Sequence, residues 1–335
     1  MKLKFLFLSM LGVILLPAFS FSAVLPPTDL LLPCNKIEMR SYIQPTVSGR
    51  WTSGCFGMVR NSGKRFHEGW DIRASKRGGQ GEVLDRVYSV YDGKIVHVSR
   101  ENNGSYGKYV VIEHRNSNIC FYSLYAHLDK IFLEVRSGMS VSSGTPIGIM
   151  GNTSSVYQIR PGFEHLHFEV GLQLGEGSFE RWYEKSFPSH DKNLHASWNG
   201  LNLSGIDPED FFREAKNKHT DFFLRLLDNT PTAFSVTVPV SRIPEILKKS
   251  PGLLLKTRED LNPSGWKILF SWSGLPKKFI PIFDLKDLNS VKIDYVSEKY
   301  IHKSVSRGMI VRKDGVYCIG KNLTNTLEII FGVSF

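Results

Sequence analysis

Short stretches of alternating hydrophobic and polar residues, interrupted by turn residues, fill the chain from about residue 41 to residue 213. Successive side chains point to opposite faces of a strand, so this alternation predicts β-strands, and the glycines, prolines and asparagines between them predict turns. The pattern favours a mainly β, mostly antiparallel structure with little helix. The clearest strands are expected at 108–114, 119–127 and 165–172, with a tight connection at 115–118.

Two local signals indicate a turn and a helix start within this β-rich region. Two short strands flank Asp92-Gly93, a dipeptide that is typical of hairpin turns. Asp207 followed by Pro208 indicates the start of a short helix, with Asp207 as its N-cap and Pro208 in its first turn. We therefore expect the first folded domain to cover residues 41–214.

The last third of the chain, residues 221–335, has strand-like stretches but no motif that indicates a chemistry. We expect it to fold as a smaller β or α/β domain of unknown role. Its strand-like stretches lie at 234–240, 266–272, 291–296 and 326–333.

The first residues have the pattern of a secretory signal. Lys2 and Lys4 precede an apolar run at 5–19 and then small residues. This run is shorter than the roughly twenty residues that span a bilayer. We expect residues 1–23 to be a signal peptide, residues 24–40 to form an N-terminal lead, and the protein to be exported to the periplasm or secreted, without a transmembrane segment.

Charge is unevenly distributed. Residues 215–335 carry 19 Lys and Arg against 11 Asp and Glu, whereas residues 24–214 carry equal numbers. A basic surface favours anionic partners such as wall polymers or phospholipid, so an anionic surface contact through the C-terminal region is one expectation. An ordinary soluble cationic surface explains the excess equally well, and export argues against nucleic acid as a partner.

The four cysteines allow three disulfide pairings in an exported chain. Cys34 and Cys55 close the shortest loop, and this is the pairing that we favour. Cys120 and Cys318 could pair with each other or stay buried thiols. None has the spacing of a zinc-binding cysteine pair, so we exclude them from a metal site.

Two short strings carry the candidate chemistry. His67 and Asp71 lie four residues apart, and His165 and His167 lie at i and i+2 in a strand-forming stretch. Residues i and i+2 of a strand share a face, so both imidazoles are expected on one side of the sheet. Zinc takes about four N, O or S ligands, and a catalytic site leaves one position for water. His67, Asp71 and one histidine of the pair would supply three ligands.

A further histidine, His127, lies between these strings in Leu-Tyr-Ala-His-Leu. The other histidines are isolated, and surface or hydrogen-bonded roles are the simpler interpretation for them: His97, His114, His190, His195, His219 and His302.

Six blocks of sequence contain these candidates together with the glycine turns and strands around them. They lie at 55–60, 66–72, 104–114, 122–128, 141–153 and 165–170. In this order they resemble the lysostaphin/LytM-like zinc metalloendopeptidases, a family that cuts peptides of bacterial peptidoglycan. The resemblance covers about residues 49–211 and implies an antiparallel β-sheet peptidase domain with a zinc groove.

The resemblance also implies a role for each candidate. His67, Asp71 and His167 would bind one Zn²⁺, and His127 and His165 would be the catalytic pair beside it. Zinc lowers the pKa of a bound water to about 7 and polarises a carbonyl. Imidazole titrates near neutral pH, so the pair could carry a proton to the leaving amine.

Two features depart from the family pattern. Residues 155–164 replace a shorter glycine-rich link, and Trp70 stands where a smaller apolar residue is common. We expect the longer loop to line one wall of the groove, which leaves the substrate preference open.

The implied function is hydrolysis of peptide bonds in peptidoglycan stem peptides or cross-bridges. Two alternatives stay open: a metalloprotease that acts on secreted or host proteins, and a wall-binding or regulatory module that does not cleave. The complete set of candidate residues argues against the second alternative.

Overall fold

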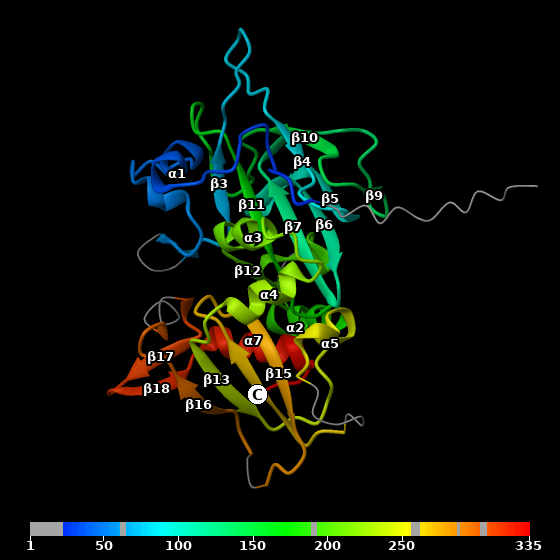
Figure 1. Cartoon of the computed structure of the whole chain (residues 1–335), viewed down its shortest axis with the longest axis vertical. Coiled ribbons are helices and arrows are strands. Elements are labelled where there is room, and N and C mark those ends of the chain that lie inside the picture. Colours follow the sequence, from blue (N-terminus) through cyan, green and yellow to red (C-terminus); the bar gives the residue numbers. More distant parts are fainter. Residues whose placement is uncertain (1–22, 61–64, 189–192, 256–261, 287–288, 302–306) are drawn as a thin grey trace, which may run out of the picture.

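The computed structural model describes residues 23–60, 65–188, 193–255, 262–286, 289–301 and 307–335. The expected signal peptide lies almost entirely outside the described residues. Figure 1 shows two parts stacked along the longest axis: a β-rich upper part from the first two thirds of the chain, and a lower part from the last third. Among the described residues, no helix has the length and apolar character that crossing a bilayer requires.

The upper part is organised around a seven-stranded antiparallel sheet. Its order is β12-β11-β7-β6-β5-β9, and β3 pairs with β11 off this path. Every residue of β7 is buried and so is most of β11, because both faces of the sheet are covered. The mainly β class and the clearest expected strands are thereby confirmed. The strands are β3 (Trp70–Arg73), β5 (Gly93–Asn103), β6 (Gly107–Asn116), β7 (Ile119–Ala126), β9 (Ser140–Val141), β11 (His165–Gln173) and β12 (Leu203–Ile206).

A three-stranded antiparallel sheet packs beside the first one. Its strands, in spatial order, are β4 (Arg86–Tyr88), β10 (Pro146–Met150) and β8 (Leu128–Ile131). The hairpin predicted around Asp92-Gly93 is wrong, because β4 pairs with β10 whereas β5 pairs with β6 and β9. The chain crosses between the sheets here. The Val90 carbonyl accepts from Leu25, and the Val90 N–H donates to the Tyr125 hydroxyl, so Val90 bonds to neither strand of a hairpin.

Short helices complete the upper part. Helix α3 (Pro208–Ala215) begins as predicted, since the Asp207 side chain accepts from the backbone N–H of Glu209. Two helices were not predicted from the sequence, which indicated little helix: α2 (Gly177–Ser186) and α1 (Lys36–Tyr42). The remaining elements are β1 (Val59–Arg60), β2 (Arg65–Phe66) and short 3₁₀ turns at 51–54, 104–106, 196–198 and 200–202.

The lower part contains a four-stranded antiparallel sheet in the order β15-β14-β13-β16, a hairpin of β17 and β18, and helices packed on the sheet (Figure 1). The strands are β13 (Phe234–Val238), β14 (Gly265–Phe270), β15 (Pro276–Ile282), β16 (Lys292–Val296), β17 (Ile310–Lys313) and β18 (Val316–Ile319). The helical segments are α4 (Phe222–Asn229), α5 (Ile246–Lys249), α7 (Lys321–Phe331) and a 3₁₀ turn at 251–253.

The strand predicted at 326–333 is wrong, because residues 326–331 belong to α7, which ends just before Gly332. Leu323, Leu327 and Ile330 are buried at the spacing of one helical face. The run of β-branched and aromatic residues at its end favoured a strand, but packing of this face overrides that local preference.

One hydrophobic core runs through both parts. Phe121 of β7 stacks on Phe223 of α4, with ring centroids 4.3 Å apart, and Phe211 of α3 packs on the same pair. Ser250 also exchanges two hydrogen bonds with the backbone of Cys120. The last third of the chain is therefore packed against the β-rich part and is not tethered by a linker alone.

The favoured Cys34–Cys55 disulfide is wrong, because all four cysteines are free thiols. Cys34 is exposed before α1, where its backbone N–H donates to Glu38, and Cys55 is half-buried beside the candidate site. The short sequence separation gave no sign that α1 and a 3₁₀ turn occupy the chain between them.

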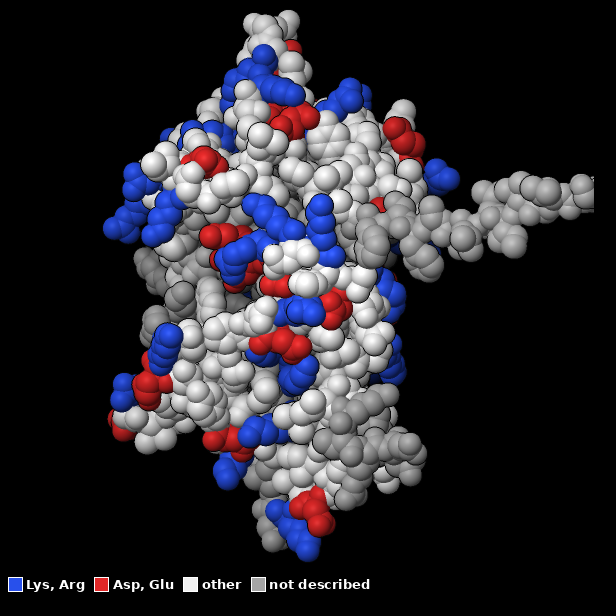
Figure 2. Space-filling model, viewed as in Figure 1, with Lys and Arg blue, Asp and Glu red and all other residues white. Residues whose placement is uncertain are grey.

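Charged side chains of both signs are interspersed over the face shown in Figure 2. On this face, neither part carries an uninterrupted basic surface. The anionic contact expected for the C-terminal region stays a prediction.

Candidate metal centre

Three polar side chains that are distant in the sequence converge between β3 and β11. In the β3–β11 ladder Asp71 lies directly opposite His167, which brings these two side chains together on one face. His67 comes from the loop before β3. His67 Nε2 lies 3.0 Å from Asp71 Oδ1 and 3.1 Å from His167 Nδ1, and His167 Nδ1 lies 2.9 Å from Asp71 Oδ1. All three residues are buried.

The outward nitrogen of each ring in this cluster faces a hydrogen-bond acceptor. His67 Nδ1 lies 2.8 Å from the carbonyl oxygen of Cys55, and His167 Nε2 lies 2.9 Å from Glu169 Oε1. Donation to these acceptors places the ring proton on the outward nitrogen and a lone pair on the inward one. The two rings therefore direct lone pairs at Asp71 Oδ1 and at each other.

The cluster is electrostatically suited to a cation. Although burial opposes ionisation, the imidazoles of His67, His165 and His167 hold the pKa of Asp71 well below its usual range. Burial also disfavours a charged His167, but the carboxylates of Asp71 and Glu169 raise the pKa of His167 to about 9. Two buried carboxylates thus stabilise a positive charge at His167 Nδ1. A proton or a metal ion can supply this charge.

The donor set fits zinc. Two imidazole nitrogens and one carboxylate oxygen are ligands that zinc accepts, and the three atoms lie close together, as in a catalytic zinc site with three protein ligands. Tetrahedral ligands at about 2.0–2.1 Å from zinc lie roughly 3.3 Å from one another. The separations of 2.9–3.1 Å between the three atoms are close to this value.

Two further histidines face the same centre. His127 lies between β7 and β8, and His165 begins β11; their ring centroids are 4.8 Å apart. His127 Nδ1 lies 2.8 Å from the Thr153 carbonyl oxygen, and His165 Nδ1 lies 2.7 Å from that of Phe163. In both rings this donation leaves a lone pair on Nε2, which can accept a proton. His165 Nε2 lies 3.6 Å from Asp71 Oδ1.

Burial keeps this second pair of rings neutral. Burial and the neighbouring His165 and His167 hold the pKa of His127 well below its usual range. Burial likewise lowers the pKa of His165, against the opposing charge of Asp71. Neutral imidazoles with inward lone pairs are the form in which histidine acts as a general base.

Four of these five residues line a cavity of about 420 Å³: Asp71, His127, His165 and His167. His67 does not line it but contacts Asp71 and His167. Residues 155–164 form one wall, as predicted for the longer loop, and contribute Tyr157, Ile159 and Phe163. The Tyr157 hydroxyl lies 3.4 Å from His127 Nε2. The other sequence departure, Trp70, is buried in the core and does not line the cavity.

Three supporting residues were not singled out from the sequence. Arg60 Nη2 pairs with Asp71 Oδ2 at 2.7 Å, Glu169 orients His167, and Tyr157 faces His127. For Glu169 a signal existed, because it follows His167 at i+2 and so lies on the same face of β11. Arg60 and Tyr157 reach the site from loops and short strands, which carry no such periodicity.

Comparisons with known proteins find similarity within the β-rich part of the chain. Residues 65–176 match the sequence profile of Peptidase family M23. The peptidoglycan DD-endopeptidase ShyA of Vibrio cholerae serotype O1 is 39% identical over 84 residues, which are 25% of this chain and 17% of the relative. The chain thus spans less than a fifth of the length of this curated relative.

Solved structures of similar proteins overlap with part of the chain. A zinc-containing peptidase from Vibrio cholerae is 32% identical, with 41% of this chain and 35% of that chain covered and a TM-score of 0.28. The catalytic domain of lysostaphin from Staphylococcus simulans is 22% identical, with 48% and 87% covered and a TM-score of 0.29.

Proposed function

We propose that this protein is a zinc-dependent endopeptidase that hydrolyses peptide bonds of peptidoglycan, because residues 65–176 match Peptidase family M23. The observation that carries the proposal is the convergence of His67, Asp71 and His167 on one point, with two neutral imidazoles facing it. Similarity to a protein named as a peptidoglycan DD-endopeptidase supports peptidoglycan as the substrate. Action on peptidoglycan also agrees with export through the expected signal peptide.

The chain's own residues supply the remaining chemistry. Zinc, when bound, acidifies a water and polarises the scissile carbonyl. His67, Asp71 and His167 would hold it, with their orientations fixed by Cys55, Arg60 and Glu169. One ring of the His127–His165 pair would accept the proton of the attacking water at its Nε2. The same ring, now protonated, would donate a hydrogen bond to the oxygen that develops charge and then pass that proton to the leaving amine.

A digest of purified peptidoglycan tests this proposal. We expect the mature protein to release peptide fragments, the release to stop after metal removal by a chelator, and zinc to restore it. Mass spectrometry of the fragments identifies the bond that is cut. Cleavage of secreted proteins but not of peptidoglycan would show that peptidoglycan is not the substrate. Full zinc occupancy without any cleavage would favour a binding module.

The charge of the cavity favours stem peptides over neutral cross-bridges. Its lining includes Arg60, Arg65 and Arg160, against Asp71 as the acidic residue. Arg60 is paired with Asp71, whereas the Arg65 guanidinium lies over the Tyr157 ring at 5.3 Å from its centroid. Stem peptides carry free carboxylates and oligoglycine bridges carry none. We therefore assign a carboxylate-bearing stem peptide to this cavity, with Arg65 as its partner.

Replacing Arg65 by Gln should weaken binding of a carboxylate-bearing stem peptide. A hydrogen bond to a charged group contributes about 1.5–3 kcal/mol, so KM should rise roughly 10-fold or more while zinc content is unchanged. Kinetics on two synthetic substrates, one with free carboxylates and one with the same carboxylates amidated, measure the effect. An equal loss on both substrates would show that Arg65 does not recognise a carboxylate.

A further inference from the structure

His67 is the one member of the metal cluster that no long strand holds. Asp71 and His167 are fixed opposite each other by the β3–β11 ladder. His67 instead depends on its local segment: its N–H donates to the Met58 carbonyl, its own carbonyl accepts from Gly57, and its ring donates to the Cys55 carbonyl. The direction of the His67 ring therefore follows the position of the chain on either side of it.

Trp272, in the turn between β14 and β15 of the C-terminal region (residues 221–335), packs on this segment. Its ring centroid lies 5.6 Å from that of Phe56 and 5.9 Å from that of Phe66. Gly57 has a φ of 78°, and a Cβ there would overlap the Trp272 ring, so the indole occupies space that only glycine leaves.

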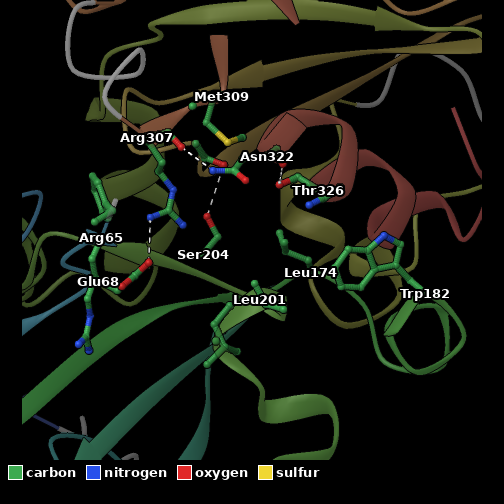
Figure 3. A pocket seen from close by; sticks show the side chains of 16 residues that line it. Arg65, Glu68, Leu174, Trp182, Leu201, Ser204, Arg307, Met309, Asn322 and Thr326 are labelled. Carbon is green, nitrogen blue, oxygen red and sulfur yellow. Dashed lines mark hydrogen bonds and ion pairs between the residues drawn. The ribbon is translucent and has the colours of Figure 1, made fainter. Parts of the chain in front are cut away.

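Arg307, also in the C-terminal region, contacts both chain neighbours of His67. Its guanidinium lies 4.4 Å from the centroid of the Phe66 ring, and its Nη1 lies 3.1 Å from Glu68 Oε1. Figure 3 shows Arg307 reaching Glu68 at the edge of a cavity of about 510 Å³ between the two parts of the molecule. The Asn322 side chain of α7 donates to the Arg307 carbonyl and ties this contact to the helix.

We infer that the C-terminal region positions His67 for metal binding, with Arg307 and Trp272 as positioning residues that act through Phe66, Glu68 and Gly57. This inference rests on the metal-binding role proposed for His67. Groups that orient a metal ligand commonly change metal affinity 10- to 100-fold when they are removed. The C-terminal region is thereby part of the apparatus that completes the metal centre.

Replacing both members of the Glu68–Arg307 ion pair by neutral residues tests the inference in the full chain. The double variant Glu68→Gln/Arg307→Met removes the ion pair and the guanidinium stacking without leaving an unpaired charge. We expect its zinc affinity, measured by competition with a chromogenic chelator, to fall about 10-fold or more. Substitution with Co²⁺ gives a visible spectrum that reports ligand geometry, and this spectrum should change too.

The chain offers a matched control. Lys249 of the same region pairs with Glu113 of β6 at 2.9 Å and lies 5.9 Å from the Trp198 ring centroid, so it also joins the two parts by an ion pair beside an aromatic ring. The other polar partners of Lys249 are Gln173 and Glu176, and neither of them flanks His67. The double variant Glu113→Gln/Lys249→Met should keep the wild-type zinc affinity and Co²⁺ spectrum at a similar loss of thermal stability.

The outcomes separate the inference from the proposed function. Wild-type protein that binds neither Zn²⁺ nor Co²⁺ would remove the proposed function itself. If the wild type binds metal and the Glu68/Arg307 variant has the same affinity and spectrum, the positioning role alone is overturned. Equal effects in both double variants would overturn it too. If the Glu68/Arg307 variant does not fold, Arg307→Lys takes its place: it keeps the charge, loses the planar stacking, and should show a smaller shift in the same two measurements.

Discussion

Replacing His167 by alanine is expected to abolish zinc binding and peptide hydrolysis together. The substitution removes one of three convergent ligand atoms and leaves Asp71 and Glu169 as buried carboxylates without the ring between them. A metal ion stabilises the charge that develops in the transition state of peptide hydrolysis by several kcal/mol. The rate of cleavage should therefore fall on the order of 10³-fold or more. Metal analysis of the purified variant and a peptidoglycan digest measure the two effects.

His97→Ala is a suitable control for the His167 variant. The His97 ring is half-buried and stacks on Tyr109, outside the metal cluster, so its removal should leave zinc content and cleavage close to wild type. Stoichiometric zinc in the His167 variant, or unchanged digestion by it, would disprove the assigned ligand set.

The second large effect is expected for replacement of His127. In this variant the cleavage rate should fall while the zinc content stays the same. His127→Ala should retain zinc, because His67, Asp71 and His167 remain, yet lose about 10²–10⁴-fold in cleavage rate through the missing proton carrier. Zinc content and turnover of one stem-peptide substrate, measured on the same preparation, check this.

A variant that loses its zinc along with its activity would make His127 a ligand, and a variant with near-normal turnover would leave His165 to act alone. Tyr157→Phe provides the companion variant, since it removes only the hydroxyl that lies 3.4 Å from His127 Nε2. We expect the Tyr157 change to affect turnover less than the His127 change.

The sequence predicted the central strands well for a physical reason. In β6, β7 and β11 the apolar residues lie on buried faces and the connection between β6 and β7 is short, so local pattern and final structure agree. The spacing of His165 and His167 predicted a shared face, and they do face one centre. What the pattern could not provide is the register that sets Asp71 opposite His167, because that depends on pairing between distant strands.

The wrong predictions have a common cause in tertiary structure. Asp92-Gly93 has the local chemistry of a hairpin turn, yet Val90 bonds outside both flanking strands and the chain passes to another sheet. The stretch 326–333 was assigned by composition, and the buried helical face of α7 decided otherwise. Arg307 and Glu68, 239 residues apart, carry no local signal of their contact at all.

X-ray absorption spectroscopy of the zinc-loaded protein tests the central claim most directly. Two imidazole nitrogens, one carboxylate oxygen and a solvent oxygen should give a first shell of N and O atoms at about 2.0–2.2 Å, with outer scattering from two imidazole rings. No cysteine sulfur of the described residues belongs to the group of convergent ligand atoms, so no sulfur should be present in the first shell. A Zn–S shell at about 2.3 Å, or a spectrum that is unchanged in His67→Ala, would contradict the assignment.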